Sequence, residues 1–132
     1  MIIDSDTHIV ENDAIWKFVS KADENYKPIS VEANEVSYAA YSSGSKRFWM
    51  IDGKLYGRGG QPSKVYAEGT RDLYNTAARM ADMDKRGHSV QVVYPSLFLN
   101  ITCKDVKAER AAVRAYNRYM ASVCEGTGGK LR

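Results

Sequence analysis

The sequence lacks the features by which membrane, secreted and nucleic-acid-binding proteins are recognised. No stretch reaches the about 20 consecutive apolar residues of a membrane span, and segment 1–6 has neither the basic nor the apolar region of a secretory signal. Two cysteines, Cys103 and Cys124, are too few and too far apart for a disulfide framework or a zinc knuckle. A net charge of +3 excludes a strongly basic domain that would bind nucleic acid. We therefore expect a cytoplasmic protein with no membrane or nucleic-acid partner.

The chain is also too short for some folds. Its 132 residues, of which 44% are hydrophobic and 27% charged, fit one soluble domain with a single core. A complete (β/α)8 barrel needs about 250 residues, so the chain can hold only part of one.

Hydrophobic periodicity predicts two strands and three helices outside the middle of the chain. In chain order these are a strand at 1–10, a helix at 14–21, a helix at 70–86, a strand at 89–94 and a helix at 105–124. Gly87 stands where a C-cap glycine belongs, and Pro95 ends the second strand. Strands that alternate with helices imply an α/β fold with a parallel sheet. Two parallel strands alone would leave both sheet edges unpaired.

Residues 24–70 differ from the rest because they are polar, rich in tyrosine and interrupted by glycine and serine. Segments 47–51 and 54–56 flank Asp52-Gly53, which predicts a β-hairpin with a two-residue turn. Residues 57–63 read as a loop. A segment this long is unusual as a simple connection, so we expect an insertion that acts as a lid.

The first predicted strand carries several ionisable groups on one face. Strict alternation places Ile2, Asp4, Asp6, His8 and Val10 on one face and the odd-numbered residues on the other. Asp6 and His8 then project to the same side about 7 Å apart, close enough to converge on one metal ion. Histidine suits Zn, Fe or Ni, and a carboxylate widens the choice to Mn or Mg. The alternative is a solvated strand end with a hydrogen-bonded histidine.

Three other polar residues could be functional or structural. Glu11, just past the strand, could touch a substrate or a metal ligand, or could be an acid at a helix N-terminus. Asp4 lies deeper in the strand, so a structural hydrogen bond is favoured over metal ligation. His88 follows the capping glycine, and we expect an exposed or hydrogen-bonded loop residue.

Three segments together resemble the amidohydrolase-2 family of TIM-barrel metal-dependent hydrolases and decarboxylases. The first is 4–11 (DSDTHIVE), which is similar to the opening strand of the family. The second is 79–95 (RMADMDKRGHSVQVVYP), similar to its helix, Met-Asp, glycine, apolar strand and Tyr-Pro. The third, 115–132, is similar to the helix and glycine turn that lead to the third strand. The resemblance covers both ends of the chain and skips 24–70.

The resemblance implies that residues 1–132 form a partial (β/α)8 fragment of about two β/α units with the hairpin inserted. Asp6 and His8 would be two ligands of a divalent metal, Zn, Mn or Fe, with Asp6 in a place often held by histidine. The further His, His and Asp ligands of the family have no counterpart here. Glu11 and Trp49, the latter on the lid, would contact the substrate. No catalytic residue is assigned.

The function implied is the N-terminal part of an enzyme that hydrolyses or decarboxylates a small organic acid, amide or ester. On this interpretation the 132 residues alone would be inactive. The alternative is a truncated, non-catalytic relative that self-associates or binds a partner through unpaired sheet edges, because strand 89–94 needs neighbours. A third is a metal site rebuilt from several copies of the chain.

Overall fold

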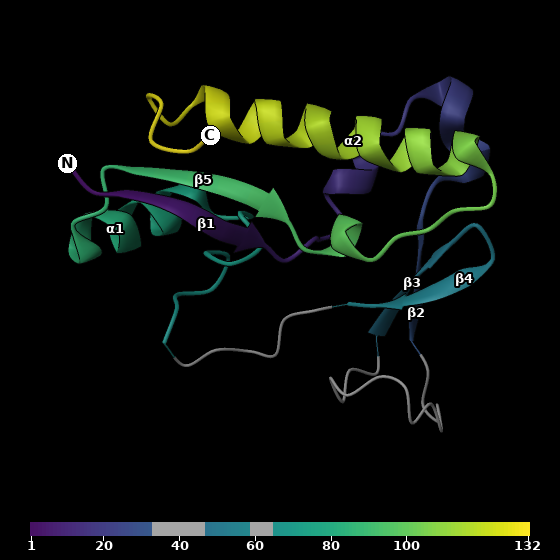
Figure 1. The fold of residues 1–132 in the computed structure, drawn as a ribbon, viewed down its shortest axis with the longest axis horizontal. Coiled ribbons are helices and arrows are strands. Elements are labelled where there is room, and N and C mark those ends of the chain that lie inside the picture. Colours follow the sequence, from purple (N-terminus) through teal and green to yellow (C-terminus); the bar gives the residue numbers. More distant parts are fainter. Residues whose placement is uncertain (33–46, 59–64) are drawn as a thin grey trace.

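The computed structural model describes residues 1–32, 47–58 and 65–132 (Figure 1). Over these residues the protein is mixed α/β, with one parallel and one antiparallel sheet and no closed barrel. The elements are β1 (Ile3–Ile9), η1 (Ile15–Phe18), η2 (Lys21–Tyr26), β2 (Ile29–Glu32), β3 (Arg47–Ile51), β4 (Lys54–Gly57), α1 (Thr76–Arg86), β5 (Val90–Pro95), η3 (Leu97–Leu99) and α2 (Val106–Glu125). No helix among them is both long enough and apolar enough to cross a membrane.

The parallel sheet consists of β1 and β5, as predicted. The expectation that both sheet edges are unpaired is wrong for β5. Its outer edge forms a parallel bridge between Gln91 and Leu131, because the glycine turn after α2 returns the chain alongside β5. The Gln91 N–H donates to the carbonyl of Lys130 at 2.8 Å, and the Arg132 N–H donates to the carbonyl of Gln91 at 3.0 Å.

One face of this sheet is covered and the other is open. Gln91 and Val93 of β5 point to the covered face and are only 4% and 8% exposed. Arg79 of α1 donates a hydrogen bond to Gln91, and Val93 belongs to the same buried cluster as Ala112 of α2. Both helices therefore pack on this face of the sheet. On the open face Tyr94 is 46% exposed.

The antiparallel sheet, in the order β2-β3-β4, lies beyond the carboxyl ends of β1 and β5 (Figure 1). The predicted hairpin is confirmed: β3 and β4 pair across Asp52 and Gly53, whose φ angles of 50° and 71° fit a type I′ turn. Strand β2 was not predicted. The predicted loop at 57–63 falls largely outside the described residues, as do 33–46 of the proposed insertion.

The helices agree with the sequence best where local signals are strongest. Helix α2 follows the prediction, and the Asp105 side chain caps it by accepting from the Lys107 N–H at 2.8 Å. Helix α1 begins at Thr76, later than predicted, because a turn with Leu73 at φ 56° precedes it. The helix predicted at 14–21 is wrong: the 3-10 helix η1 ends at Phe18, Val19 and Ser20 are extended, and a second 3-10 helix, η2, begins only at Lys21.

Candidate functional site

A bulge in β1 decides which side chains of this strand reach each face of the sheet. Asp4 pairs with Gln91 and Thr7 with Val93, so three residues of β1 span the distance of two in β5. The predicted strict alternation is therefore wrong beyond Asp4, because one extra residue reverses the faces of those that follow. Asp4 and Thr7 share the covered face, while His8, opposite Tyr94, lies on the open face.

Asp6 and His8 lie close together near the carboxyl end of β1. The Oδ1 of Asp6 lies 3.4 Å from the Nε2 of His8. The Asp6 side chain is 87% exposed and that of His8 38%, so the pair is open to solvent. The ring of Tyr94 stands 6.1 Å from that of His8 and flanks the pair on the open face.

A backbone contact holds the His8 ring. Its Nδ1 lies 3.1 Å from the carbonyl oxygen of Pro95. A carbonyl can only accept, so Nδ1 carries the proton and donates it. In the neutral ring the lone pair is then on Nε2, the nitrogen that faces Asp6. Metal-binding histidines typically have this arrangement, in which one nitrogen donates to a carbonyl and the other binds the ion.

The pair fits two positions of a metal site. Two ligand atoms at about 2.1 Å from one ion in tetrahedral geometry lie about 3.4 Å apart. The separation of Asp6 Oδ1 and His8 Nε2 matches this value without rearrangement. Across 1–32, 47–58 and 65–132 no group of three or more His, Cys, Asp or Glu side chains gathers to complete such a site. Within the described residues the pair would therefore supply two ligands at most.

Glu11 forms a buried structural contact and does not face an open site. Its side chain is buried, at 6% exposure, and its Oε1 accepts from the N–H groups of Ser96 and Leu97 at 2.8 and 2.9 Å. Burial raises the pKa of this carboxyl group, although the two N–H donors oppose the shift. Glu11 thereby ties the end of β1 to the residues that follow Pro95, whose carbonyl orients His8. Its predicted substrate contact remains a prediction that this geometry does not favour.

Trp49 is placed in the core. It is 1% exposed, meets the ring of Trp16 edge-on at 5.3 Å, and carries the Arg58 guanidinium 3.9 Å above its own ring. A side chain so enclosed has no free surface for a ligand in this conformation. Its predicted role as a lid contact with substrate therefore gains no support from the geometry.

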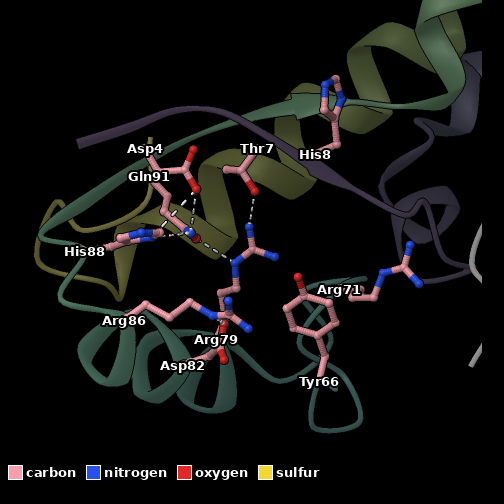
Figure 2. A pocket seen from close by; sticks show the side chains of 10 residues that line it. All are labelled: Asp4, Thr7, His8, Tyr66, Arg71, Arg79, Asp82, Arg86, His88 and Gln91. Atoms are coloured by element: carbon pink, nitrogen blue, oxygen red, sulfur yellow. Dashed lines mark hydrogen bonds and ion pairs between the residues drawn. The ribbon is translucent and has the colours of Figure 1, made fainter. Parts of the chain in front are cut away.

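A second site, which the sequence did not predict, lies between β1, β5 and α1 (Figure 2). It is a pocket of about 240 Å³. Ten residues line it: Asp4, Thr7, His8, Tyr66, Arg71, Arg79, Asp82, Arg86, His88 and Gln91. Arg79 and Met83 stand four positions apart on α1 and are its two buried residues, and this spacing is the signal that could have identified the inward face.

Comparison of the sequence with models of known families and with curated proteins finds no match. The two candidate sites are accordingly defined by geometry. One is the pair of Asp6 and His8 on the open face of the sheet, and the other is the pocket beside Arg79 on the covered face.

Proposed function

We propose that this chain is the N-terminal part of a metal-dependent enzyme in which Asp6 and His8 bind a divalent cation, Zn, Mn or Fe. The observation that carries the proposal is the preorganised His8 ring. Its Nδ1 donates to Pro95 and its Nε2 lies 3.4 Å from the Asp6 carboxylate. The separation of these two atoms equals that of two ligands on one ion.

The placement of both helices on one face of the parallel sheet supports the interpretation that the site belongs to a (β/α)8 barrel. In such barrels the helices cover the outer face, the inner face is enclosed by the other strands, and active sites lie at the carboxyl ends of the strands. Here α1 and α2 pack on one face of the sheet, and His8 lies on the other face near the end of β1. The TIM-barrel interpretation of 1–132 is part of this proposal.

The reaction proposed is hydrolysis or decarboxylation of a small organic acid, amide or ester. A metal bound at such a site would polarise a carbonyl or lower the pKa of a bound water. The residues of this chain contribute by holding the ring of His8 in position. The carbonyl of Pro95 fixes the His8 tautomer, and Glu11 holds the two residues after Pro95 by their N–H groups.

Metal titration tests the proposal. Binding of Zn²⁺ and Mn²⁺ is measured by calorimetry on the wild-type chain and on His8→Ala and Asp6→Asn. We expect both variants to lose at least about tenfold in affinity, since even removal of a supporting group costs about 10–100-fold. His88→Ala is the matched control: this histidine contacts Asp4 and Gln91 instead, and its loss should leave metal affinity unchanged. Equal metal affinity in His8→Ala and wild type would refute the proposal.

The second candidate, a non-catalytic role through self-association, is favoured by exposed apolar side chains around β1. Ile2 and Ile3 are 55% and 52% exposed, and within the described residues no strand pairs with the outer edge of β1. An unpaired edge invites pairing with another chain. Size-exclusion chromatography with light scattering distinguishes the outcomes: a concentration-dependent dimer lost in Ile3→Lys supports this role, and a stable monomer counts against it.

A further inference from the structure

Arg79 is a buried cation whose hydrogen bonds are all to neutral groups. Its side chain comes from α1 and the residue is 6% exposed. The Nε–H donates to Gln91 Oε1 at 2.7 Å, one Nη donates to Thr7 Oγ1 at 2.5 Å, and the other Nη donates to the Thr70 carbonyl at 3.3 Å. No carboxylate of the described residues lies within ion-pair distance of it. Burial lowers the pKa of the guanidinium, as expected for a cation without a contacting counter-charge.

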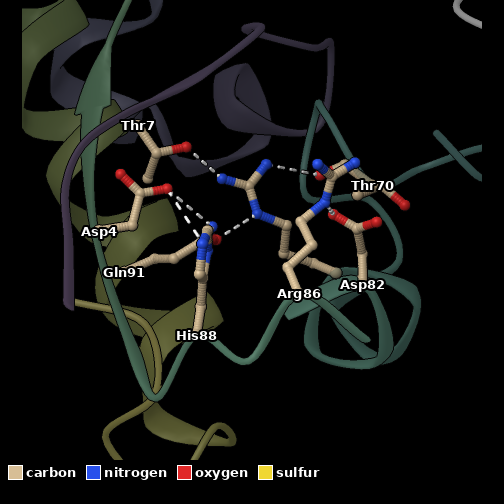
Figure 3. Close-up of polar contacts among 8 residues, drawn as sticks. Asp4, Thr7, Thr70, Asp82, Arg86, His88 and Gln91 are labelled. Atoms are coloured by element: carbon tan, nitrogen blue, oxygen red, sulfur yellow. Dashed lines mark hydrogen bonds and ion pairs between the residues drawn. The ribbon is translucent and has the colours of Figure 1, made fainter. Parts of the chain in front are cut away.

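The neighbouring acids already have partners. Asp82 pairs with Arg86 at 2.9 Å. Asp4 accepts from the Gln91 side chain at 3.1 Å and lies 3.7 Å from His88 (Figure 3). The lining of the pocket thus combines three arginines with two aspartates, and neither aspartate lies within ion-pair distance of Arg79.

Two donors of Arg79 remain unused. Each terminal nitrogen carries two N–H groups and donates one of them to Thr7 or Thr70, so one N–H on each nitrogen has no acceptor among the described residues. A carboxylate offers two oxygens for these two donors and one negative charge for the Arg79 guanidinium, which contacts no carboxylate of the described residues.

We propose that the pocket beside Arg79 binds a small monocarboxylate. The bound carboxylate supplies the counter-charge that Arg79 lacks, and burial away from water strengthens the pairing. Tyr66 borders the same pocket, with the Arg86 guanidinium 5.1 Å from its ring centre, and offers an aromatic surface to the body of the ligand (Figure 2).

This site is separate from the proposed metal site. His8 borders the pocket, but Figure 2 shows its ring directed away from Arg79. Asp6 does not line the pocket. Inorganic phosphate is disfavoured as the ligand, because a dianion would carry one charge more than the Arg79 guanidinium balances and would face the carboxylates of Asp4 and Asp82.

Titration of the isotopically labelled chain, followed by NMR at constant ionic strength with chloride as the reference salt, tests the proposal. The probes are acetate, benzoate and inorganic phosphate. In the wild type we expect saturable shifts of resonances lining the pocket with acetate or benzoate. Arg79→Lys keeps the charge but loses the paired donors, and should weaken carboxylate binding by about tenfold or more.

Two variants at less buried residues of the lining test the proposal even if Arg79→Lys fails to fold. Arg86→Gln lowers the lining charge and should weaken binding, whereas Asp4→Asn raises it and should tighten binding. Arg114→Gln, an exposed arginine on α2 away from the pocket, is the control and should leave affinity unchanged.

Three results would overturn the proposal. The first is no saturable response to either carboxylate beyond that of chloride. The second is tighter binding of phosphate than of both carboxylates. The third is a carboxylate affinity that changes equally in Arg86→Gln, Asp4→Asn and the Arg114→Gln control.

Discussion

Glu11 joins the end of β1 to the segment after β5, and its replacement measures how much this contact stabilises the sheet. In Glu11→Ala the N–H groups of Ser96 and Leu97 lose their acceptor. A hydrogen bond to a charged group contributes about 1.5–3 kcal/mol, but removing a buried carboxylate also relieves its desolvation. We therefore expect a net loss of about 2–4 kcal/mol in the free energy of unfolding at pH 7.

Glu11→Gln is the matched control, because it keeps an acceptor oxygen but cannot ionise. Burial, the largest effect, raises the pKa of Glu11 in the folded chain above 4.5. The native state therefore holds the proton more tightly than the unfolded state. The bound proton of Glu11 stabilises the fold fully at pH values below the pKa of this residue in the unfolded chain. This stabilisation is lost as the pH rises through the pKa of Glu11 in the folded chain. Wild type should consequently lose stability relative to Glu11→Gln as the pH increases from about 4 toward neutrality.

Urea unfolding of the wild type and both variants, followed by circular dichroism between pH 4 and pH 8, provides the free energies. The reasoning is refuted if Glu11→Ala lies within about 0.5 kcal/mol of wild type, which is the range of an ordinary surface substitution. It is also refuted if wild type gains stability relative to Glu11→Gln as pH rises across this interval.

Three further substitutions test the local fold by urea unfolding. Gly87→Ala should cost about 1–2 kcal/mol because its φ is 73°, while Gly126→Ala, at φ −83° with no atom near its added Cβ, should be close to neutral; equal losses would contradict the argument. Asp105→Ala should cost about 1 kcal/mol by removing the cap of α2, and an unchanged midpoint would show that this cap is dispensable. Met83→Ala, at 0% exposure, should cost about 2–4 kcal/mol, and Met50→Ala, at 38%, much less; a reversed order would place the core elsewhere.

The features predicted from sequence are those whose signals are local. The hairpin at Asp52-Gly53 needs residues that tolerate positive φ, and both have it. The C-cap at Gly87 and the extent of α2 likewise depend on neighbours within a few positions, so periodicity and capping residues were sufficient. The parallel pairing of β1 with β5 followed from the alternation of strands and helices.

The features that were missed depend on contacts between distant segments. The pocket of Arg79 needs Thr7 and Gln91, which lie 72 and 12 residues away in the chain. The burial of Glu11 depends on N–H groups of Ser96 and Leu97, more than 80 residues later. No short-range pattern encodes such pairings. For the candidate metal site, the sequence predicted that Asp6 and His8 converge, but not the carbonyl of Pro95 that orients the ring.

The bulge in β1 explains how one short strand can contribute to both candidate sites. Under strict alternation Asp4, Asp6 and His8 would share a face, and Thr7 would point away from Asp4. The extra residue instead puts Asp4 and Thr7 on the covered face, where Gln91 and Arg79 provide polar partners. Polar groups can be buried there because those hydrogen bonds offset the cost of leaving water. Asp6 and His8 remain exposed to solvent, where an ion can reach them. The two proposals therefore depend on different residues of β1, and the failure of metal binding at His8 would leave the argument from Arg79 intact.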